Sequence, residues 1–139
     1  MTLGGMHHLS LSVSDMTQSA AFYDAVLGVL GYRRFPSPED MVIWAKREAG
    51  TVIISPSNPD SPNKVHDRYS PGIHHFAFGA DSRDDVEWLH ARLQEIGANV
   101  LDPPAEYDYM PGYYAVFFAD PDGLKLELCH TPLPPPETC

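Results

Sequence analysis

Three residues of this chain, His8, His75 and Glu127, carry side chains that bind divalent metal ions in many proteins. They lie far apart, in three short segments in which apolar and polar residues alternate. Because successive side chains of a β-strand point to opposite faces of a sheet, each segment is expected to form a strand with one apolar and one polar face. All three residues fall on the polar face. The pattern therefore predicts two imidazoles and one carboxylate that meet on one sheet face and hold a divalent metal with open positions.

Glu127 follows a segment that favours a tight turn. In residues 120–123, Asp-Pro-Asp-Gly, the proline fixes φ, the aspartates bond to the local backbone and the glycine accepts a positive φ. The strand beyond the turn places its leucines on the face opposite Glu127. A single glutamate at such a position is most often a solvated surface residue. The two histidines of matching parity favour a metal ligand instead.

The segments around His8 and His75 each begin the same succession of elements. The first copy has strands over 7–14, 31–35, 41–46 and 51–55 and a helix over 16–27; the second has strands over 73–80, 98–102, 113–119 and 124–130, a helix over 83–96 and a loop over 103–112. Ser14 or Asp15 supplies the N-cap of the first helix, and Asp81 or Ser82 that of the second. This internal duplication predicts an α+β protein of two tandem βαβββ modules.

We expect the two modules to form a single domain over residues 1–139. Module one covers about 6–55 and module two about 73–130, and the proline-rich stretch 56–72 is the linker between them. Residues 131–139 form a loose tail. With 139 residues, 43% of them hydrophobic, the chain is long enough to bury a core of its own.

The charge balance excludes several classes of partner. A formal net charge of −10 without any cluster of lysine and arginine argues against nucleic acid and against an anionic membrane surface. No segment reaches the roughly 18 consecutive apolar residues of a membrane span, and the N-terminus lacks the features of a signal peptide. The two cysteines, Cys129 and Cys139, do not indicate a disulfide framework. We therefore expect a cytoplasmic protein.

Three motifs together resemble the vicinal oxygen chelate superfamily, which includes glyoxalase I, fosfomycin thiol transferases, extradiol dioxygenases and bleomycin resistance proteins. The motifs are HHLSLSVSD, GIHHFAFGADS and FADPDGLKLEL, and the resemblance extends from about Met6 to His130. It implies a cupped, mostly antiparallel sheet with the helices on its outer face, and a homodimer. It also implies that His8, His75 and Glu127 bind one divalent metal ion, which is Fe, Mn, Ni or Zn.

The sequence departs from two members of this superfamily. Aligning Gly50 with Gly123 places Ile54 where glyoxalase I has a second glutamate, so three protein ligands are expected and a mechanism with two glutamates is not. Where the fosfomycin transferases hold a phosphonate with serine and tyrosine, this chain has Ala115 and Phe117. An anionic substrate would also meet an acidic protein.

Further residues are expected around the metal. Ser10, Ile54, Tyr113 and Phe117 are the candidate substrate-binding residues, and Glu127 is also the candidate catalytic residue. Tyr107 and Tyr109 are candidates for a lid from the 103–112 loop, although packing is the commoner role of such aromatic residues. By parity, His7, His74 and His130 face the helices and are interpreted as structural.

Two classes of function follow from these patterns. The first is a metal-dependent enzyme, a lyase, isomerase, transferase or dioxygenase, whose small substrate chelates the metal through adjacent oxygens. The second is a metal-free protein that sequesters a small molecule, as bleomycin resistance proteins do. The His/His/Glu set favours the enzyme.

Overall fold

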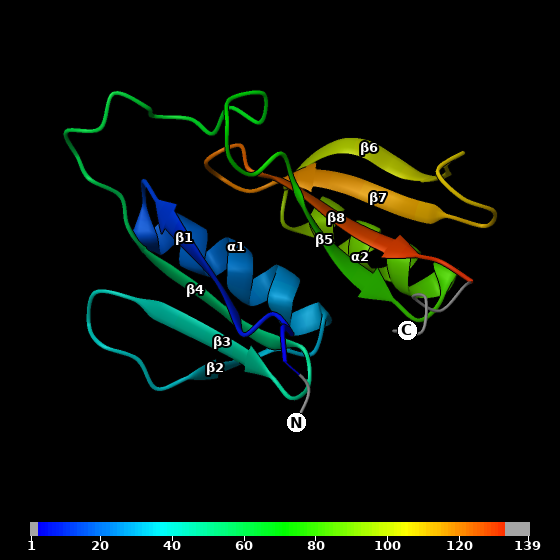
Figure 1. Ribbon diagram of the computed structural model, residues 1–139, viewed down its shortest axis with the longest axis horizontal. Coiled ribbons are helices and arrows are strands. Elements are labelled where there is room, and N and C mark those ends of the chain that lie inside the picture. The colour runs from blue at the N-terminus through cyan, green and yellow to red at the C-terminus, as the bar shows by residue number, and fades with distance from the viewer. Residues whose placement is uncertain (1–2, 133–139) are drawn as a thin grey trace. The chain divides into compact units, whose positions relative to one another are not determined.

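The computed structural model describes residues 3–132, and the chain forms two compact units, Met1–Lys64 and Val65–Cys139. Unit 1 contains β1 (His8–Val13), α1 (Met16–Val29), β2 (Arg33–Phe35), β3 (Val42–Lys46) and β4 (Gly50–Pro56). Unit 2 contains β5 (Phe76–Ala80), α2 (Arg83–Glu95), β6 (Asn99–Glu106), β7 (Tyr114–Ala119) and β8 (Lys125–His130). Each unit is thus a βαβββ module (Figure 1), and the predicted α+β fold with two tandem modules is confirmed.

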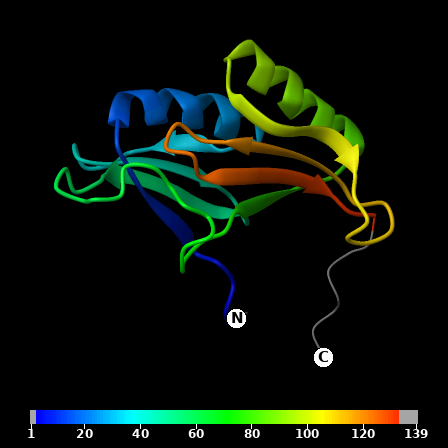
Figure 2. The same ribbon diagram turned by 90° about the horizontal axis from the view of Figure 1, so that it is seen from above.

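The two sheets have equivalent topologies. Unit 1 orders its strands β1-β4-β3-β2, and unit 2 orders its strands β5-β8-β7-β6. In each sheet the first strand pairs in parallel with the last strand of its module, and the other pairings are antiparallel. In each unit the helix covers one face of its own sheet (Figure 2). The strand that follows the turn at residues 120–123 is therefore an inner strand of unit 2.

The helices begin at the residues that the sequence favours as N-caps. The Asp15 carboxylate accepts a hydrogen bond from the Gln18 backbone N–H at 2.9 Å, and Ser82 and Asp85 form a reciprocal capping box. Each cap satisfies backbone donors that have no partner inside the helix. The helices among the described residues have 14 and 13 residues, and neither is long and apolar enough to cross a membrane.

The core of each unit lies between its helix and the apolar face of its sheet. The fully buried side chains include Val13, Val26, Leu27, Trp44 and Ile54 in unit 1, and Val86, Leu89, Leu93, Phe118, Leu126 and Leu128 in unit 2. The leucines of β8 belong to this core, as their alternation predicts. The opposite face of β8 carries Lys125, Glu127 and Cys129.

Strand β6 corrects one expectation. Residues 103–112 were expected to form a loop, but β6 continues through Pro103 and Pro104 to Glu106. Strand β6 lies at the edge of its sheet, where proline, which has no backbone N–H, can be accommodated without losing a hydrogen bond to a neighbouring strand. Its register with β7 also shifts on either side of Asp102. Strand β5 also starts later than expected, at Phe76, so that His75 stands just before it.

In unit 1, Asp24 joins α1 to β2 and β3. Its carboxylate accepts two hydrogen bonds from Arg34, at 2.8 and 2.7 Å, and one from the indole N–H of Trp44 at 2.9 Å. Trp44 is 1% exposed, so this contact satisfies a buried donor. The hydrogen bonds from Arg34 are the largest cause of a pKa of Asp24 below its usual 3.8.

Replacing Asp24 by alanine is expected to lower the free energy of unfolding by about 1–3 kcal/mol, because the buried indole N–H loses its acceptor. Asp24→Asn, which keeps an oxygen for Trp44, should recover most of that loss. Because the pKa of Asp24 is lowered in the folded state, its charge stabilises the protein above pH 3.8 and loses that effect as acid protonates it. Urea unfolding at neutral and acidic pH measures both effects; equal losses for the two variants would contradict the role given to Trp44.

Candidate functional site

Strands β5 and β8 bring His75 and Glu127 together. Ala77 pairs with Glu127 in the parallel ladder, and His75, two residues before Ala77, lies on the same face. The Nε2 of His75 is 3.1 Å from the Oε2 of Glu127. The His75 side chain is 36% exposed and that of Glu127 only 2%, so a buried carboxylate faces an imidazole that solvent can reach.

The second oxygen of Glu127 is held by Tyr113, just before β7. The phenol of Tyr113 donates a hydrogen bond to Oε1 of Glu127. Burial is the largest cause of a strongly raised pKa of Tyr113, which keeps the phenol protonated and able to donate. The thiol of Cys129, whose pKa is also raised mainly by burial, donates to the carbonyl of Phe78 at 3.6 Å. Glu127 is therefore fixed from the side opposite His75.

A histidine pair occurs at the start of each module. The Nδ1 atoms of His74 and His75 are 2.8 Å apart, and those of His7 and His8 are 2.9 Å apart. In both pairs the rings are nearly perpendicular, at 78° and 87°. One Nδ1 in each pair donates and the other accepts, which leaves the Nε2 of His8 and of His75 available to another partner.

The donors in unit 2 fit a divalent metal ion. Two ligands bonded to one such ion at about 2.1 Å stand about 3 Å apart, close to the 3.1 Å between His75 and Glu127. The Nδ1 of His75 bonds to His74, and the Oε1 of Glu127 accepts a hydrogen bond from Tyr113. In metal sites, the ligand atoms that do not bind the metal usually have hydrogen-bond partners of this kind. Within the described part of either unit, no three His, Cys, Asp or Glu side chains are arranged so that they could hold a metal ion together. Unit 2 alone thus supplies two of the three expected ligands.

His8 and Ser10 occupy the positions that parity assigns to them in unit 1. Both are exposed, and they pair in parallel with Thr51 and Ile53 of β4. Val13 of the same strand is 1% exposed and faces the core. The polar face of β1 is therefore open, as the alternation predicts.

The placement of Ile54 on the site face is wrong. Ile54 pairs with Leu11 and Val42, is fully buried, and faces helix α1 with the rest of the core. Ser10 lies two residues beyond His8, as Ala77 does beyond His75, so the counterpart of Glu127 is the partner of Ser10, Ile53. Module one has one residue fewer between Gly50 and Ile53 than module two has between Gly123 and Glu127. Aligning the two glycines therefore selected Ile54 instead of Ile53. Ile53 carries no carboxylate either, so the expectation of a single glutamate remains.

Aromatic side chains surround Glu127 in unit 2. Phe117 stands opposite Glu127 in the antiparallel ladder, and its ring contacts His75 and Tyr107 edge to face. Phe117 is only 4% exposed, whereas Tyr109 is 66% exposed. The structure thus places Tyr113 and Phe117 beside Glu127.

Two contacts at this site were missed in the sequence. His74 was interpreted as facing the helix, but it precedes the strand and bonds to His75. The His-His doublet that opens both repeats could have indicated it. The contact of Tyr113 with Glu127 depends on the pairing of β7 with β8, which alternation does not specify.

Comparison with known proteins gives consistent results. The family model described as Glyoxalase/Bleomycin resistance protein/Dioxygenase superfamily matches residues 5–128. The uncharacterized protein YqjT of Bacillus subtilis is 35% identical over 127 residues, which are 88% of this chain and 96% of that protein. The metallothiol transferase FosB of Bacillus licheniformis is 27% identical over 91% of this chain and 75% of its own length. The crystal structure of a putative glyoxalase from Bacillus halodurans matches with a TM-score of 0.80 and 29% identity, covering 93% of this chain and 97% of that one.

Replacing Tyr113 by phenylalanine is expected to lower the free energy of unfolding by about 1.5–3 kcal/mol, because the buried Glu127 carboxylate loses a hydrogen bond. Tyr109→Phe is the matched control: it removes a hydroxyl from an exposed ring next to Tyr113 and should change stability by less than about 0.5 kcal/mol. Chemical denaturation of both variants without metal measures the difference. A Tyr113→Phe variant as stable as its control would contradict the role of this contact.

Proposed function

The chain belongs to the Glyoxalase/Bleomycin resistance protein/Dioxygenase superfamily, and we propose from this premise that it is a divalent-metal-dependent enzyme whose small substrate chelates the metal through two adjacent oxygens. The observation that carries the proposal is the 3.1 Å approach of His75 Nε2 to the buried Oε2 of Glu127. Burying a carboxylate costs several kcal/mol unless it is paired. Its retention at the exposed imidazole supports a binding role.

The proposed ligands are His8, His75 and Glu127. Two observations support the inclusion of His8. It lies on the exposed polar face of β1, and it bonds to His7 as His75 bonds to His74. A divalent ion bound there would supply Lewis-acid chemistry, polarising a substrate carbonyl or hydroxyl. The His/His/Glu set suits Fe, Mn, Ni or Zn.

The chain's own groups around these ligands have distinct proposed roles. Tyr113, protonated because of its raised pKa, holds Oε1 of Glu127 and fixes the carboxylate plane. Glu127 is also the proposed catalytic residue, which would accept a substrate proton. His74 holds the ring of His75 through Nδ1. Ser10, Tyr113 and Phe117 remain the proposed substrate-binding residues.

Among the relatives, the protein named a metallothiol transferase supports a metal-dependent transfer reaction, and the structure described as a putative glyoxalase supports an isomerase or lyase reaction. The single glutamate supports a mechanism other than that of the two-glutamate glyoxalases. We propose a homodimer in the cytoplasm, as the family resemblance implies.

Metal content tests the proposed function directly. Protein purified without chelator, or reconstituted with Mn, Fe, Ni or Zn, is expected to hold about one equivalent of divalent metal. His8→Ala, His75→Ala and Glu127→Ala should each lose it and keep the native circular dichroism spectrum. Elemental analysis of the four proteins is the measurement. Less than about a tenth of an equivalent with every metal would instead favour a metal-free sequestering protein.

The proposed role of His74 predicts an effect on metal affinity separate from ligation. His74→Ala should weaken binding of Zn or Co about tenfold or more, because the ring of His75 loses the partner that orients it. His74→Asn, which offers an amide group near the Nδ1 position, should recover part of the affinity. His90→Ala, in α2, is the control. Competition titrations with a chelating dye give the dissociation constants; an unchanged value for His74→Ala would contradict this role.

A further inference from the structure

We propose that unit 2 carries, beside His75 and Glu127, a subsite for an anionic group of the substrate, a carboxylate or a phosphonate, formed by Arg68 and Lys125 with His66 and His74. We call these four residues the basic cluster. The inference rests on the proposed function in that the anion would belong to the molecule bound at His75 and Glu127.

The ion pairing of unit 2 separates two basic residues from the others. The unit has four arginines and lysines: Arg68, Arg83, Arg92 and Lys125. Arg83 pairs with Glu106 at 3.0 Å, and Arg92 pairs with Glu95 at 2.9 Å. Neither Arg68 nor Lys125 has a carboxylate within ion-pair distance among the described residues. Arg68 instead donates a hydrogen bond to the hydroxyl of Tyr69 at 3.0 Å, which is a neutral partner.

Arg68 is held in place by the turn that precedes β8. The backbone N–H of His66 donates to the carbonyl of Asp122 at 2.9 Å. Asp67 then closes a local turn, accepting hydrogen bonds from the backbone N–H of Tyr69 at 3.0 Å and the hydroxyl of Ser70 at 2.7 Å. The segment that carries Arg68 is thus fixed against the turn from which Lys125 begins β8.

Ring contacts connect Arg68 to His75. The guanidinium of Arg68 lies 5.0 Å from the centre of the Tyr69 ring, and that ring contacts His74 at 5.6 Å. His74 bonds directly to His75. Arg68 therefore approaches the proposed metal ligand through two aromatic rings.

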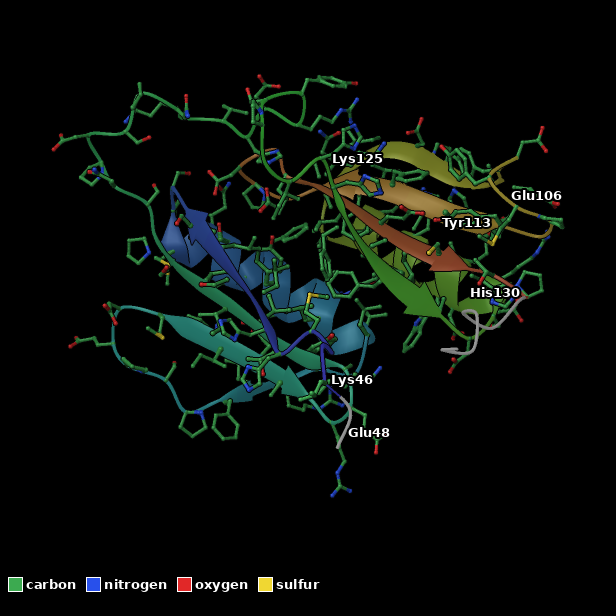
Figure 3. The ribbon with its side chains drawn as sticks, in the orientation of Figure 1. Lys46, Glu48, Glu106, Tyr113, Lys125 and His130 are labelled. Atoms are coloured by element: carbon green, nitrogen blue, oxygen red, sulfur yellow. The ribbon has the colours of Figure 1, made fainter. Side chains whose placement is uncertain are left out.

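Lys125 approaches His75 along the sheet. Figure 3 labels Lys125 at the start of β8. Lys125 stands two residues before Glu127, so strand alternation places both side chains on the same face. Its Nζ lies 4.2 Å from the centre of the Phe117 ring, which in turn contacts His75 at 6.4 Å. The ring of Phe117 thus contacts both Lys125 and His75.

His66 belongs to the segment that carries Arg68, two residues before it, and its backbone is bonded to Asp122. The Nδ1 of His66 is buried and has no hydrogen-bond partner in the described part of the chain. The segment that carries Arg68 therefore also contains a buried imidazole nitrogen without a hydrogen-bond partner among the described residues.

The chemistry of this cluster suits an oxyanion. Both cations are half-buried, and such charges cost free energy until a counter-charge reaches them. A guanidinium binds carboxylate or phosphonate oxygens through two parallel hydrogen bonds, and an ammonium adds a point charge. A local positive potential on an acidic protein also directs an anionic ligand to this position. The basic cluster would thus attract an anionic substrate locally, although the chain as a whole is acidic.

The test uses the full chain freed of metal by chelation and titrated with inorganic phosphate, acetate and methylphosphonate. Amide ¹H–¹⁵N NMR spectra should show saturable shifts for residues 66–75 and around Lys125. The Arg68→Gln, Lys125→Gln double variant should bind the preferred anion at least about tenfold more weakly, because two charge-assisted contacts are lost. Arg83→Gln with Arg92→Gln, which removes the same charge from the ion-paired arginines, should leave the affinity within about twofold. Comparing the three anions separates a carboxylate site from a phosphonate site.

An equal loss of affinity in both double variants, or no saturable binding of any of the three anions, would overturn the subsite. The Arg68→Gln and Lys125→Gln single variants, each expected to bind more weakly than the wild type, repeat the test if the double variant does not fold. Because these titrations contain no metal, their outcome is independent of metal analysis: the subsite can fail while metal binding succeeds, and the reverse.

Discussion

The contact between His75 and Glu127 is the interaction on which the rest of unit 2 depends. A carboxylate that is 2% exposed carries a large desolvation cost, and it is stable here because one oxygen accepts from Tyr113 while the other faces an imidazole 3.1 Å away. The exposed side of that imidazole is where a further ligand can approach. One contact therefore stabilises a buried carboxylate and leaves it beside an imidazole that solvent can reach.

The βαβββ topology produces this contact from residues far apart in sequence. The parallel pairing of β5 with β8 brings the residue before β5 beside the middle of β8. The antiparallel pairing of β7 with β8 brings Tyr113 to the other side of the same carboxylate. Helix α2 covers the opposite face, so the leucines of β8 are buried against it while Glu127 faces the other way. The site thus occupies the sheet face that the helix leaves uncovered.

The arginines and lysines of unit 2 differ in their partners. Arg83 and Arg92 are neutralised by carboxylates on the surface, where such pairs contribute little to stability. Among the described residues, Arg68 and Lys125 have no ion-pair partner, and aromatic rings connect each of them to His75. An acidic chain can therefore attract an anion at the proposed subsite, because a ligand responds to the nearest charges rather than to the net charge.

Alternation and turn chemistry in the sequence determined the α+β class, the duplicated module, both helix caps and the face on which His75 and Glu127 lie. These properties depend on residues close together in the chain. The spacing of apolar residues, every two in a strand and every 3.6 in a helix, therefore reveals them. Only the tertiary structure decided that Ile53 rather than Ile54 is the counterpart of Glu127, that β6 continues through two prolines, and that the rings of Tyr69 and His74 connect Arg68 to His75. These depend on which strands pair, in what register and at which edge, and such long-range choices leave no periodic trace in the chain.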